Sequence, residues 1–452
     1  MGMEYRSLAR VFHADRTNNA FNNHAKLARQ RLEADSTFRT GVVTPLGELY
    51  AATPRETSLL MEKILLAERR ISRLWNQFPG VMRWDYIRHS ISEELFATNE
   101  MEGVRSTRKE TREAVAAAEK ARKGGDDAKA RFSEFAKLYL HLTDRDSALP
   151  SGIADIRDIY DKVVLDEIDK NDKPDGELFR KGDVEIQGPH GLAIHNGVTG
   201  ESNISALLTS MIHLATSDEI PRLPAAIMSH FLFEYIHPFY DGNGRTGRYL
   251  LALYLNHDLT MPTVLSLSRT IAENKNAYYK AFMEAEGKLN CGELTFFVNT
   301  ILGFIQRAQD ELIDELEVRV DRLGKGEAVC DQLERKHGLS AKAVSILYGV
   351  IQEEMFDSSK SMTLDDAAYH IGLSKQSARK YVGELMDMGL VIQSGKRPLK
   401  IRASESLKGI LDAGIGEDGG EHGDKTQQQE EAGGRPGRRL QRLLPQPVDE
   451  LT

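Results

Sequence analysis

Hydrophobic residues recur about every 3.6 positions over most of this 452-residue chain, and glycine and proline are sparse inside these stretches. This spacing predicts amphipathic helices, each with one apolar face to bury. Five helices are predicted with clear bounds, at 59–78, 84–103, 202–217, 223–236 and 245–257. A further stretch, 113–142, is predicted to form a helix and then a turn at Gly124-Gly125. We therefore expect a mainly α-helical fold.

One segment departs from the helical pattern. Between residues 176 and 198, Val184 and Ile186 precede a Gly-Pro turn, and Leu192 and Ile194 follow it. Alternation of apolar and polar positions on both sides of a turn predicts a β-hairpin. We therefore expect one small hairpin inside an otherwise helical domain.

The last third of the chain has another order of elements. A helix is predicted at 344–356. Residues 362–403 then show a helix, a tight turn at Gly372, a second helix with Ser374 as N-cap, a stop at Gly389 and a short hairpin. This order resembles a winged helix-turn-helix.

These patterns divide the chain into four predicted parts. They are an N-terminal helical region at 1–84, a central domain at 85–310, a C-terminal module at 325–405 and a tail at 412–452. The tail is polar, of low complexity and without a periodic apolar set, so it is predicted to be disordered.

Composition narrows the class of protein. The chain is 40% hydrophobic and 28% charged, which is typical of globular domains with their own cores. There is no run of eighteen apolar residues and no apolar signal segment, which argues against a membrane protein. Cys291 and Cys330 lie in unrelated contexts, as expected for reduced thiols in a cytoplasmic protein. The net charge of −9 argues against wholesale binding of nucleic acid.

The most informative stretch is HPFYDGNGRTGR, residues 237–248. Gly242 and Gly244 lack Cβ atoms, so the backbone there can approach a ligand closely. The loop runs directly into a predicted helix, whose first N–H groups and dipole form an anion site, above all for phosphate. Arg245 and Arg248 are three residues apart, so both can face the same anion.

Two further residues of this stretch add chemistry. Asp241 would repel a phosphate unless a cation lies between them, which makes it a natural Mg²⁺ ligand shared with phosphate oxygens. His237 is a titratable imidazole beside the phosphate site and can deprotonate a hydroxyl. The stretch is not a P-loop, because the Gly-Lys-Ser/Thr ending is absent. Singly, these residues suit a turn, a cap and surface charges; together they predict phosphoryl or nucleotidyl transfer to a hydroxyl.

The same twelve residues resemble the HPFx(D/E)GNGRxxR signature of Fic-domain proteins of the Fido superfamily, with every defining position filled. The resemblance extends over roughly 85–305, where GELFR and VEIQG are similar to the family's flap strand and 267–282 is similar to the helical segment after the signature. It implies a Fic helical core with a β-hairpin flap. It also implies Mg²⁺-dependent transfer of AMP from ATP to a Ser, Thr or Tyr hydroxyl of a target protein (AMPylation).

The resemblance implies a role for each residue of the signature. His237 would be the general base, and Asp241 would bind Mg²⁺ between the α- and β-phosphates. Phe239 would anchor the loop in the core. The hairpin at about 183–197 would be the flap, on which a target segment pairs as an added strand. The remaining assigned residues would contact the phosphates: Gly242, Asn243 and Gly244 as the anion hole, Arg245 on the phosphates, and Arg248 on the γ-phosphate.

A second pattern lies upstream of the signature. Residues 98–103, TNEMEG, resemble the family's inhibitory (S/T)xxxE(G/N) motif, on a helix at about 88–103 that precedes the core as in one class of the family. A Glu102 carboxylate paired with Arg248 would take the cation that the γ-phosphate needs. The alternative is a solvated glutamate at the end of a helix. In some family members the same glutamate supports removal of AMP, and that role stays open here.

The C-terminal module leaves two interpretations open. Its candidate recognition helix begins with residues 374–380. The candidate wing contains four basic residues: Lys396, Arg397, Lys400 and Arg402. Such residues suit contacts of 362–402 with DNA phosphates and grooves. Nearby acidic residues dilute the positive face and favour protein docking or dimerisation instead. For the whole chain, the alternative function is a DNA-binding regulator whose Fic domain uses another nucleotide donor. The target protein and the oligomeric state, with a homodimer as one option, also stay open.

Overall fold

The structure is a computed structural model that describes residues 5–125, 130–144, 147–164, 167–169, 172–187, 193–356, 361–396 and 398–413. It is mainly α-helical with small antiparallel sheets, as predicted. The predicted tail at 412–452 lies outside the described residues, apart from its first two. None of the helices in the described ranges combines the length and the apolar character that a membrane crossing requires.

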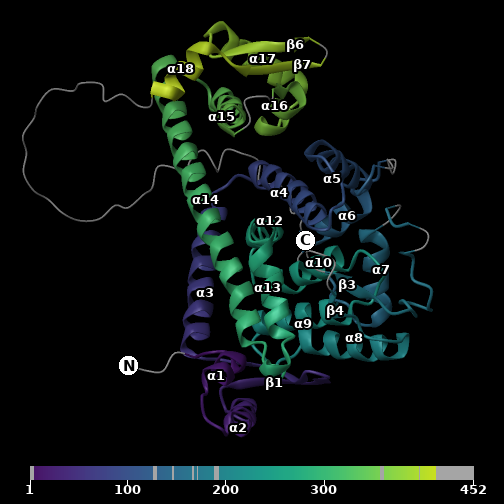
Figure 1. Cartoon of the computed structure of the whole chain (residues 1–452). Coiled ribbons are helices and arrows are strands. Elements are labelled where there is room, and N and C mark those ends of the chain that lie inside the picture. The colour runs from purple at the N-terminus through teal and green to yellow at the C-terminus, as the bar shows by residue number, and fades with distance from the viewer. Residues whose placement is uncertain are drawn as a thin grey trace, which may run out of the picture. The chain divides into compact units, whose positions relative to one another are not determined.

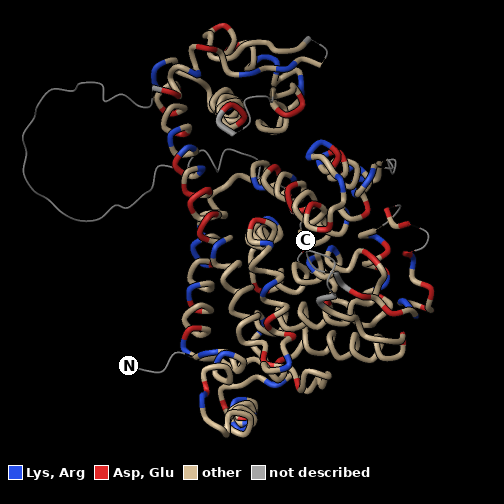
Figure 2. Tube along the Cα trace, in the orientation of Figure 1, with Lys and Arg blue, Asp and Glu red and all other residues tan. Residues whose placement is uncertain are grey.

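The chain divides into two compact units. Among described residues, the first contains 5–73 and 82–313, and the second contains 74–81 and 314–413. The predicted boundary at 84/85 falls inside helix α4 (Gly80–Met101). The predicted start of the C-terminal module at 325 falls inside the long helix α14 (Thr295–His337). Figure 2 shows charged residues of both signs along α14.

Two buried helices form the centre of the first unit. They are α9 (Arg222–Ile236) and α10 (Asn243–Leu255), and almost every side chain in them is buried. A helix that is apolar on all sides is stable only inside a core, which explains their position. Around them lie α5 (Arg108–Arg122), α6 (Ser133–His141), α7 (Ile153–Val163), α8 (Glu201–Ala215), α11 (Met261–Val264), α12 (Leu267–Glu273) and α13 (Lys275–Ala285) (Figure 1).

The signature connects these two helices. Residues 237–242 form the loop between α9 and α10, which contact each other along their lengths. The predicted hairpin is present as strands β3 (Glu185–Gln187) and β4 (Ala193–Asn196), which pair antiparallel beside α9 and α10 (Figure 1). The turn between them, including Leu192, lies outside the described residues.

The N-terminal region differs from the sequence prediction. It contains α3 (Arg55–Trp75), where the helix at 59–78 was predicted, and two further helices, α1 (Leu8–Ala14) and α2 (Ala20–Leu32). It also contains a second hairpin of β1 (Thr37–Thr44) and β2 (Gly47–Ala52). Burial alternates at the end of β1, which is the strand pattern that a search for helical periodicity passes over. The region predicted to be helical therefore includes a sheet.

The second unit has its own core. After α14 it contains α15 (Ala341–Phe356), β5 (Met362–Thr363), α16 (Leu364–Ile371), α17 (Lys375–Asp387), β6 (Val391–Lys396), β7 (Leu399–Ala403) and α18 (Glu405–Ala413). The strand order is β5-β7-β6, and apolar side chains from α15, α16, α17 and the sheet pack together. Ser374 caps α17 by accepting from the Ser377 N–H, and Gly372 takes the left-handed conformation between α16 and α17.

Candidate active site

The site begins with a strained residue at the end of α9. His237 has φ of 51°, a left-handed conformation that is uncommon for residues other than glycine. The Arg180 side chain holds it there: Nε donates to the His237 carbonyl (2.8 Å) and Nη2 donates to the Ile236 carbonyl (3.2 Å). Arg180 is fully buried, so this cation is committed to main-chain carbonyls and fixes the base of the loop.

The same guanidinium ties the flap to the loop. Arg180 Nη1 donates to the Gly182 carbonyl (2.7 Å) and Nη2 donates to the Val198 carbonyl (2.9 Å), so both ends of the hairpin are held. Val198 N–H also donates to the Ile236 carbonyl (3.1 Å). The sequence analysis included Arg180 in a flap-like segment but assigned it no role. The signal in the sequence that could have indicated its role is its position, directly after the apolar Phe179 and just before the predicted hairpin.

The middle of the loop is anchored in the core. Phe239 is fully buried and its ring stacks on Tyr160 of α7, with 3.5 Å between the ring centroids. The Asn243 side chain braces the same residue, because its Oδ1 accepts from Phe239 N–H (3.0 Å) and its Nδ2 donates to the Phe239 carbonyl (2.8 Å). The predicted contribution of Asn243 to an anion hole is therefore limited to its backbone N–H.

The N-terminus of α10 has the geometry of an anion site. Its N-cap, Gly242, has φ of 81°, and a Cβ atom there would also collide with Val164. The first N–H groups of a helix lack intrahelical acceptors and carry the positive end of its dipole. Asp241, immediately before them, is exposed, and its Oδ1 accepts from the Gly242 N–H (2.6 Å).

The last turn of α4 reaches this anion site. Arg248 makes three hydrogen bonds to it: Nε to Thr98 Oγ1 (2.9 Å), Nη2 to the Thr98 carbonyl (3.2 Å) and Nη2 to Glu102 Oε1 (2.7 Å). The Arg248 side chain is 2% exposed and that of Glu102 is 23% exposed. A Cβ atom on Gly244 would collide with the Glu102 carboxylate, so this carboxylate lies directly against the first turn of α10.

Burial and nearby charges set the ionisation of these groups. Burial raises the pKa of Glu102, but the charge and hydrogen bond of Arg248 outweigh it and hold the pKa below its usual range. Burial lowers the pKa of His237 to about 4, and the charge of nearby His195 adds to this, so the imidazole is neutral at physiological pH. Burial raises the pKa of Glu234 to about 8. The ionised carboxylate that balances Arg248 is thus Glu102.

The other arginine of the signature is also paired, which the sequence analysis did not predict. Arg245 Nη1 donates to Glu167 Oε2 (2.6 Å), and the two side chains are 1% and 6% exposed. Glu167 also accepts from Arg131 Nε (3.0 Å). Arg245 Nε is buried and has no hydrogen-bond partner among the described residues. Glu167 lies in an acidic segment after α7, where its sequence does not distinguish it from its neighbours.

The site suits a metal that is shared with a ligand. Within the described ranges, His, Cys, Asp and Glu do not form a group of three or more that could hold an ion. Asp241 is a single exposed carboxylate at the mouth of a helix N-terminus. Mg²⁺ is commonly held by one or two carboxylates together with substrate phosphates and water. The donor set therefore fits a phosphate-bound Mg²⁺ and not an ion held by protein alone.

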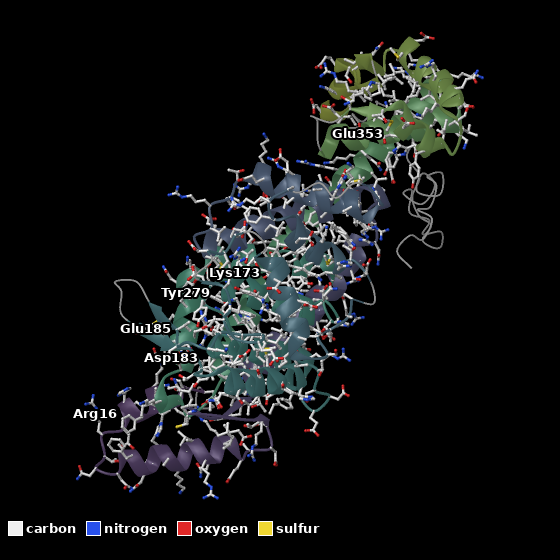
Figure 3. The ribbon with its side chains drawn as sticks, turned by 90° about the vertical axis from the view of Figure 1, so that its right-hand side faces the viewer. Arg16, Lys173, Asp183, Glu185, Tyr279 and Glu353 are labelled. Carbon is white, nitrogen blue, oxygen red and sulfur yellow. The ribbon has the colours of Figure 1, made fainter. Side chains whose placement is uncertain are left out.

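The predicted docking segment borders the loop. In Figure 3 the labelled Asp183 and Glu185, at the start of the flap, and Tyr279 of α13 lie along one side of the first unit. Tyr279 is 38% exposed and close enough to Glu102 for that carboxylate to raise its pKa further, after the larger effect of burial. The surface beside the loop thus carries acidic and aromatic side chains.

Within the described part of residues 362–402, exposed basic side chains lie on α17 and β7. They are Lys375, Arg379 and Lys380 on α17, and Lys400 and Arg402 on β7. Lys375 pairs with Asp365 of α16 (2.5 Å), which offsets part of this charge. The predicted wing residue Arg397 lies outside the described residues.

One family model matches the part of the chain that contains this site. Residues 150–255, which include the flap and the loop, match the model of the Fic/DOC family. Similar solved structures include a Fic family protein from Desulfovibrio desulfuricans G20 (18% identity, TM-score 0.46, 78% of this chain and 97% of that chain covered). Others are Fic-1 (residues 134–508) from C. elegans (14%, 0.43, 69% and 82%) and a Fic-domain-containing signaling protein from Bacteroides thetaiotaomicron VPI-5482 (15%, 0.38, 58% and 97%).

Proposed function

We propose that this chain, which carries a Fic/DOC-family domain at residues 150–255, transfers AMP from ATP to a hydroxyl of a target protein. One observation carries the proposal. A buried neutral imidazole, a helix N-terminus and two buried arginines converge on the ends of one loop, between α9 and α10. Nucleotidyl transfer requires a base for the hydroxyl and a preorganised site for phosphates, and these residues supply both.

The proposed reaction is a single displacement at the α-phosphorus of ATP. The target oxygen forms a bond to this phosphorus, the bond to the bridging oxygen of the β-phosphate breaks, and pyrophosphate leaves. His237 accepts the proton of the hydroxyl. Its lowered pKa keeps it in the accepting form at neutral pH.

The phosphates would lie at the first turn of α10. Backbone N–H groups there are free of intrahelical acceptors, and the unpartnered Nε of Arg245 is a buried donor that an anion would satisfy. Arg248 would bind the γ-phosphate once Glu102 is displaced. Mg²⁺ held by Asp241 would neutralise phosphate charge when bound.

We further propose that Glu102 restrains this reaction. Its carboxylate occupies the space against Gly244 and accepts a hydrogen bond from Arg248, so it excludes a phosphate from the same position. Lys275 Nζ donates to the Met101 carbonyl (2.7 Å) and so supports the last turn of α4. The contacts to Thr98 give Arg248 a geometry that a nucleotide would have to disrupt.

The flap is the proposed docking element for the target. Its two short strands pair only with each other among the described residues, so an extended peptide could add to an edge of the hairpin. Arg180 donates to the carbonyl of His237 and to that of Val198, just after the hairpin, and so holds the base of the flap beside His237. A strand added to the flap would therefore lie close to the proposed base.

The decisive experiment uses the full chain with Glu102→Gly and ATP labelled at the α-phosphate. Labelled self-modification should increase at least about tenfold over the unsubstituted chain, because Arg248 becomes free for the nucleotide. Mass spectrometry should find an added AMP on a hydroxyl residue. Labelling that does not change contradicts the restraint, and labelling from another nucleotide only contradicts ATP as the donor. Incubating the modified product with the unsubstituted chain tests AMP removal.

A second candidate function belongs to residues 362–402. We propose that they form a winged helix-turn-helix that binds DNA, supported by the exposed Lys375, Arg379 and Lys380 on α17 and the basic residues of β7. A gel shift with random duplex DNA at rising salt concentration tests this. Binding that weakens steeply with salt supports phosphate contacts, and no binding at low salt favours protein docking.

A further inference from the structure

His195 of β4 contacts two elements other than its own. Its Nδ1 lies 2.9 Å from Glu286 Oε2, at the end of α13, and its Nε2 lies 2.7 Å from the carbonyl oxygen of Tyr235, in the last turn of α9. The His195 and Glu286 side chains are 10% and 15% exposed. One imidazole thus joins the flap to the helix that ends at His237.

The partners of His195 fix its protonation state. A carboxylate and a main-chain carbonyl only accept hydrogen bonds, whereas a neutral imidazole donates from one nitrogen only. Both contacts of His195 are short, and a proton on each nitrogen lets both act as hydrogen bonds to these acceptors. The geometry therefore favours the imidazolium, with its charge balanced by the Glu286 carboxylate.

The end of β4 packs directly on the proposed base. Gly197 lies two residues after His195, and a Cβ atom at Gly197 would lie 3.1 Å from the Cβ atom of His237. Gly197 N–H donates to the Val184 carbonyl (3.1 Å), which closes the base of the hairpin. A shift of β4 along or away from α9 would therefore change the space above His237.

We propose that His195 is a positioning residue, which as an imidazolium clamps flap strand β4 to the end of α9 and to Glu286 so that a docked hydroxyl meets His237. This inference rests on the proposed function, because it assigns the clamp a role in AMP transfer. It adds a residue that touches neither the nucleotide nor the reacting atoms.

Electrostatics support the clamp. The charged and titratable groups around His195 are Glu286, which follows α13, Arg180 before the flap and the neutral imidazole of His237. Burial lowers the pKa of His195, but the hydrogen bond and charge of Glu286 outweigh it and raise the pKa above its ordinary value. His195 is therefore fully protonated at pH values below the ordinary histidine pKa of about 6.5, and it loses its proton as pH rises through the raised pKa.

The activity test compares His195→Gln and Glu286→Gln, each in the full chain carrying Glu102→Gly. Each should lower kcat for labelled self-modification about tenfold, because a small displacement of a reacting group is costly, while the KM for ATP changes less than about twofold. His141→Ala is the matched control, since it removes an exposed His–Asp pair (3.4 Å) and should change neither parameter. Unchanged kcat, or an equal loss of ATP affinity, would overturn the inference.

The pH profile separates positioning from a merely structural role. In the Glu102→Gly chain, kcat should fall at high pH as His195 loses its proton. His195→Lys keeps a cation at this position, so it should restore part of the rate and move the fall to higher pH. A fall at the same pH in the His195→Lys chain would contradict the clamp.

A readout without activity keeps the inference distinct from the proposed function. The unsubstituted full chain is labelled with ¹⁵N-histidine, and the ring nitrogens of His195 are assigned by comparison with His195→Gln. At about pH 6, below the ordinary pKa of a histidine, both nitrogens should be protonated, and Glu286→Gln should lower the population of this state. Amide exchange of β4 should then become at least about tenfold faster. If no donor labels the Glu102→Gly chain, the proposed function fails; a neutral His195 at that pH overturns the inference by itself.

Discussion

Two carboxylates pair with the two arginines in the first turns of α10, but the surroundings of the two pairs differ. Glu102 ends a long helix, contacts Arg248 and lies against Gly244, in the space of the proposed phosphate. Glu167 follows α7 and is shared between Arg245 and a second arginine. In the proposed mechanism, similar ion pairs therefore have opposite effects. The first would compete with a ligand for its site, whereas the second would hold an arginine in place and leave other donors of its guanidinium available.

The largest expected effect sets the baseline for this comparison. His237→Ala in the Glu102→Gly chain should lower transfer by about a thousandfold or more, because the hydroxyl loses its base. Affinity for a fluorescent ATP analogue should change less than about threefold, because the imidazole contributes no phosphate contact. Transfer that survives in this variant would show that another group accepts the proton.

Removing the competing carboxylate should have the next largest effect. Glu102→Gly should tighten ATP binding at least about tenfold, because the γ-phosphate no longer has to displace the Glu102 carboxylate from Arg248. Glu102→Gln should give a smaller gain, since the amide oxygen still accepts from Arg248 but carries no charge. Calorimetric titration of the unsubstituted, Glu102→Gly and Glu102→Gln chains with ATP and Mg²⁺ measures the three affinities. Equal affinities would contradict competition between Glu102 and the nucleotide.

Glu167→Gln should shift binding in the opposite direction. Arg245 would lose its ionic partner and part of its fixed orientation, so ATP affinity should fall about threefold to tenfold. The double variant with Glu102→Gly tests whether the two arginines act independently. Additive free energies support separate roles, and a marked deviation shows that the two pairs form one network. If Glu167→Gln tightens binding, Glu167 is a second competitor.

The smallest expected effect is that of pH near neutrality on the restraint by Glu102. The Glu102 pKa is lowered in the folded chain, so its pairing with Arg248 is complete at neutral pH and weakens only as pH falls through that lowered value. The ratio of the transfer rate of the Glu102→Gly chain to that of the unsubstituted chain should therefore change less than about twofold between about pH 6 and 8. In the Glu102→Gly chain, the acid limb of the transfer rate should lie near the His237 pKa of about 4. An acid limb near about 6.5 would show an imidazole exposed to solvent.

The sequence alone predicted the parts of the site that are local. Periodicity located α9 and α10, and the glycines between them indicated the loop. These features follow from neighbouring residues, so a pattern in the chain is enough to find them. The upstream position of Glu102 came from a motif resemblance, since no periodicity could relate it to Arg248, 146 residues away.

The sequence did not predict the parts that depend on tertiary packing. Glu167 meets Arg245 across 78 residues, and Arg180 meets the His237 carbonyl across 57 residues. Glu167 belongs to no distinctive pattern, and Arg180 lies in the flap-like GELFR segment with no role predicted for it. Each residue acquires its contacts from the surfaces that fold around it. The hairpin β1–β2 was missed for a local reason, because buried and exposed positions alternate in only part of its strands.

The contact between Lys275 and the Met101 carbonyl has a consequence for how strongly the chain restrains itself. A carboxylate tethered next to its arginine acts as a competitor at fixed effective concentration, independent of the amount of protein. That concentration depends on how often the last turn of α4 is formed. By thermodynamic reciprocity, any partner that stabilises this turn weakens nucleotide binding by the same factor by which the nucleotide weakens that partner. Under the proposed restraint, Lys275, outside the loop, would therefore be a residue through which the sensitivity to ATP could be tuned without altering the chemistry.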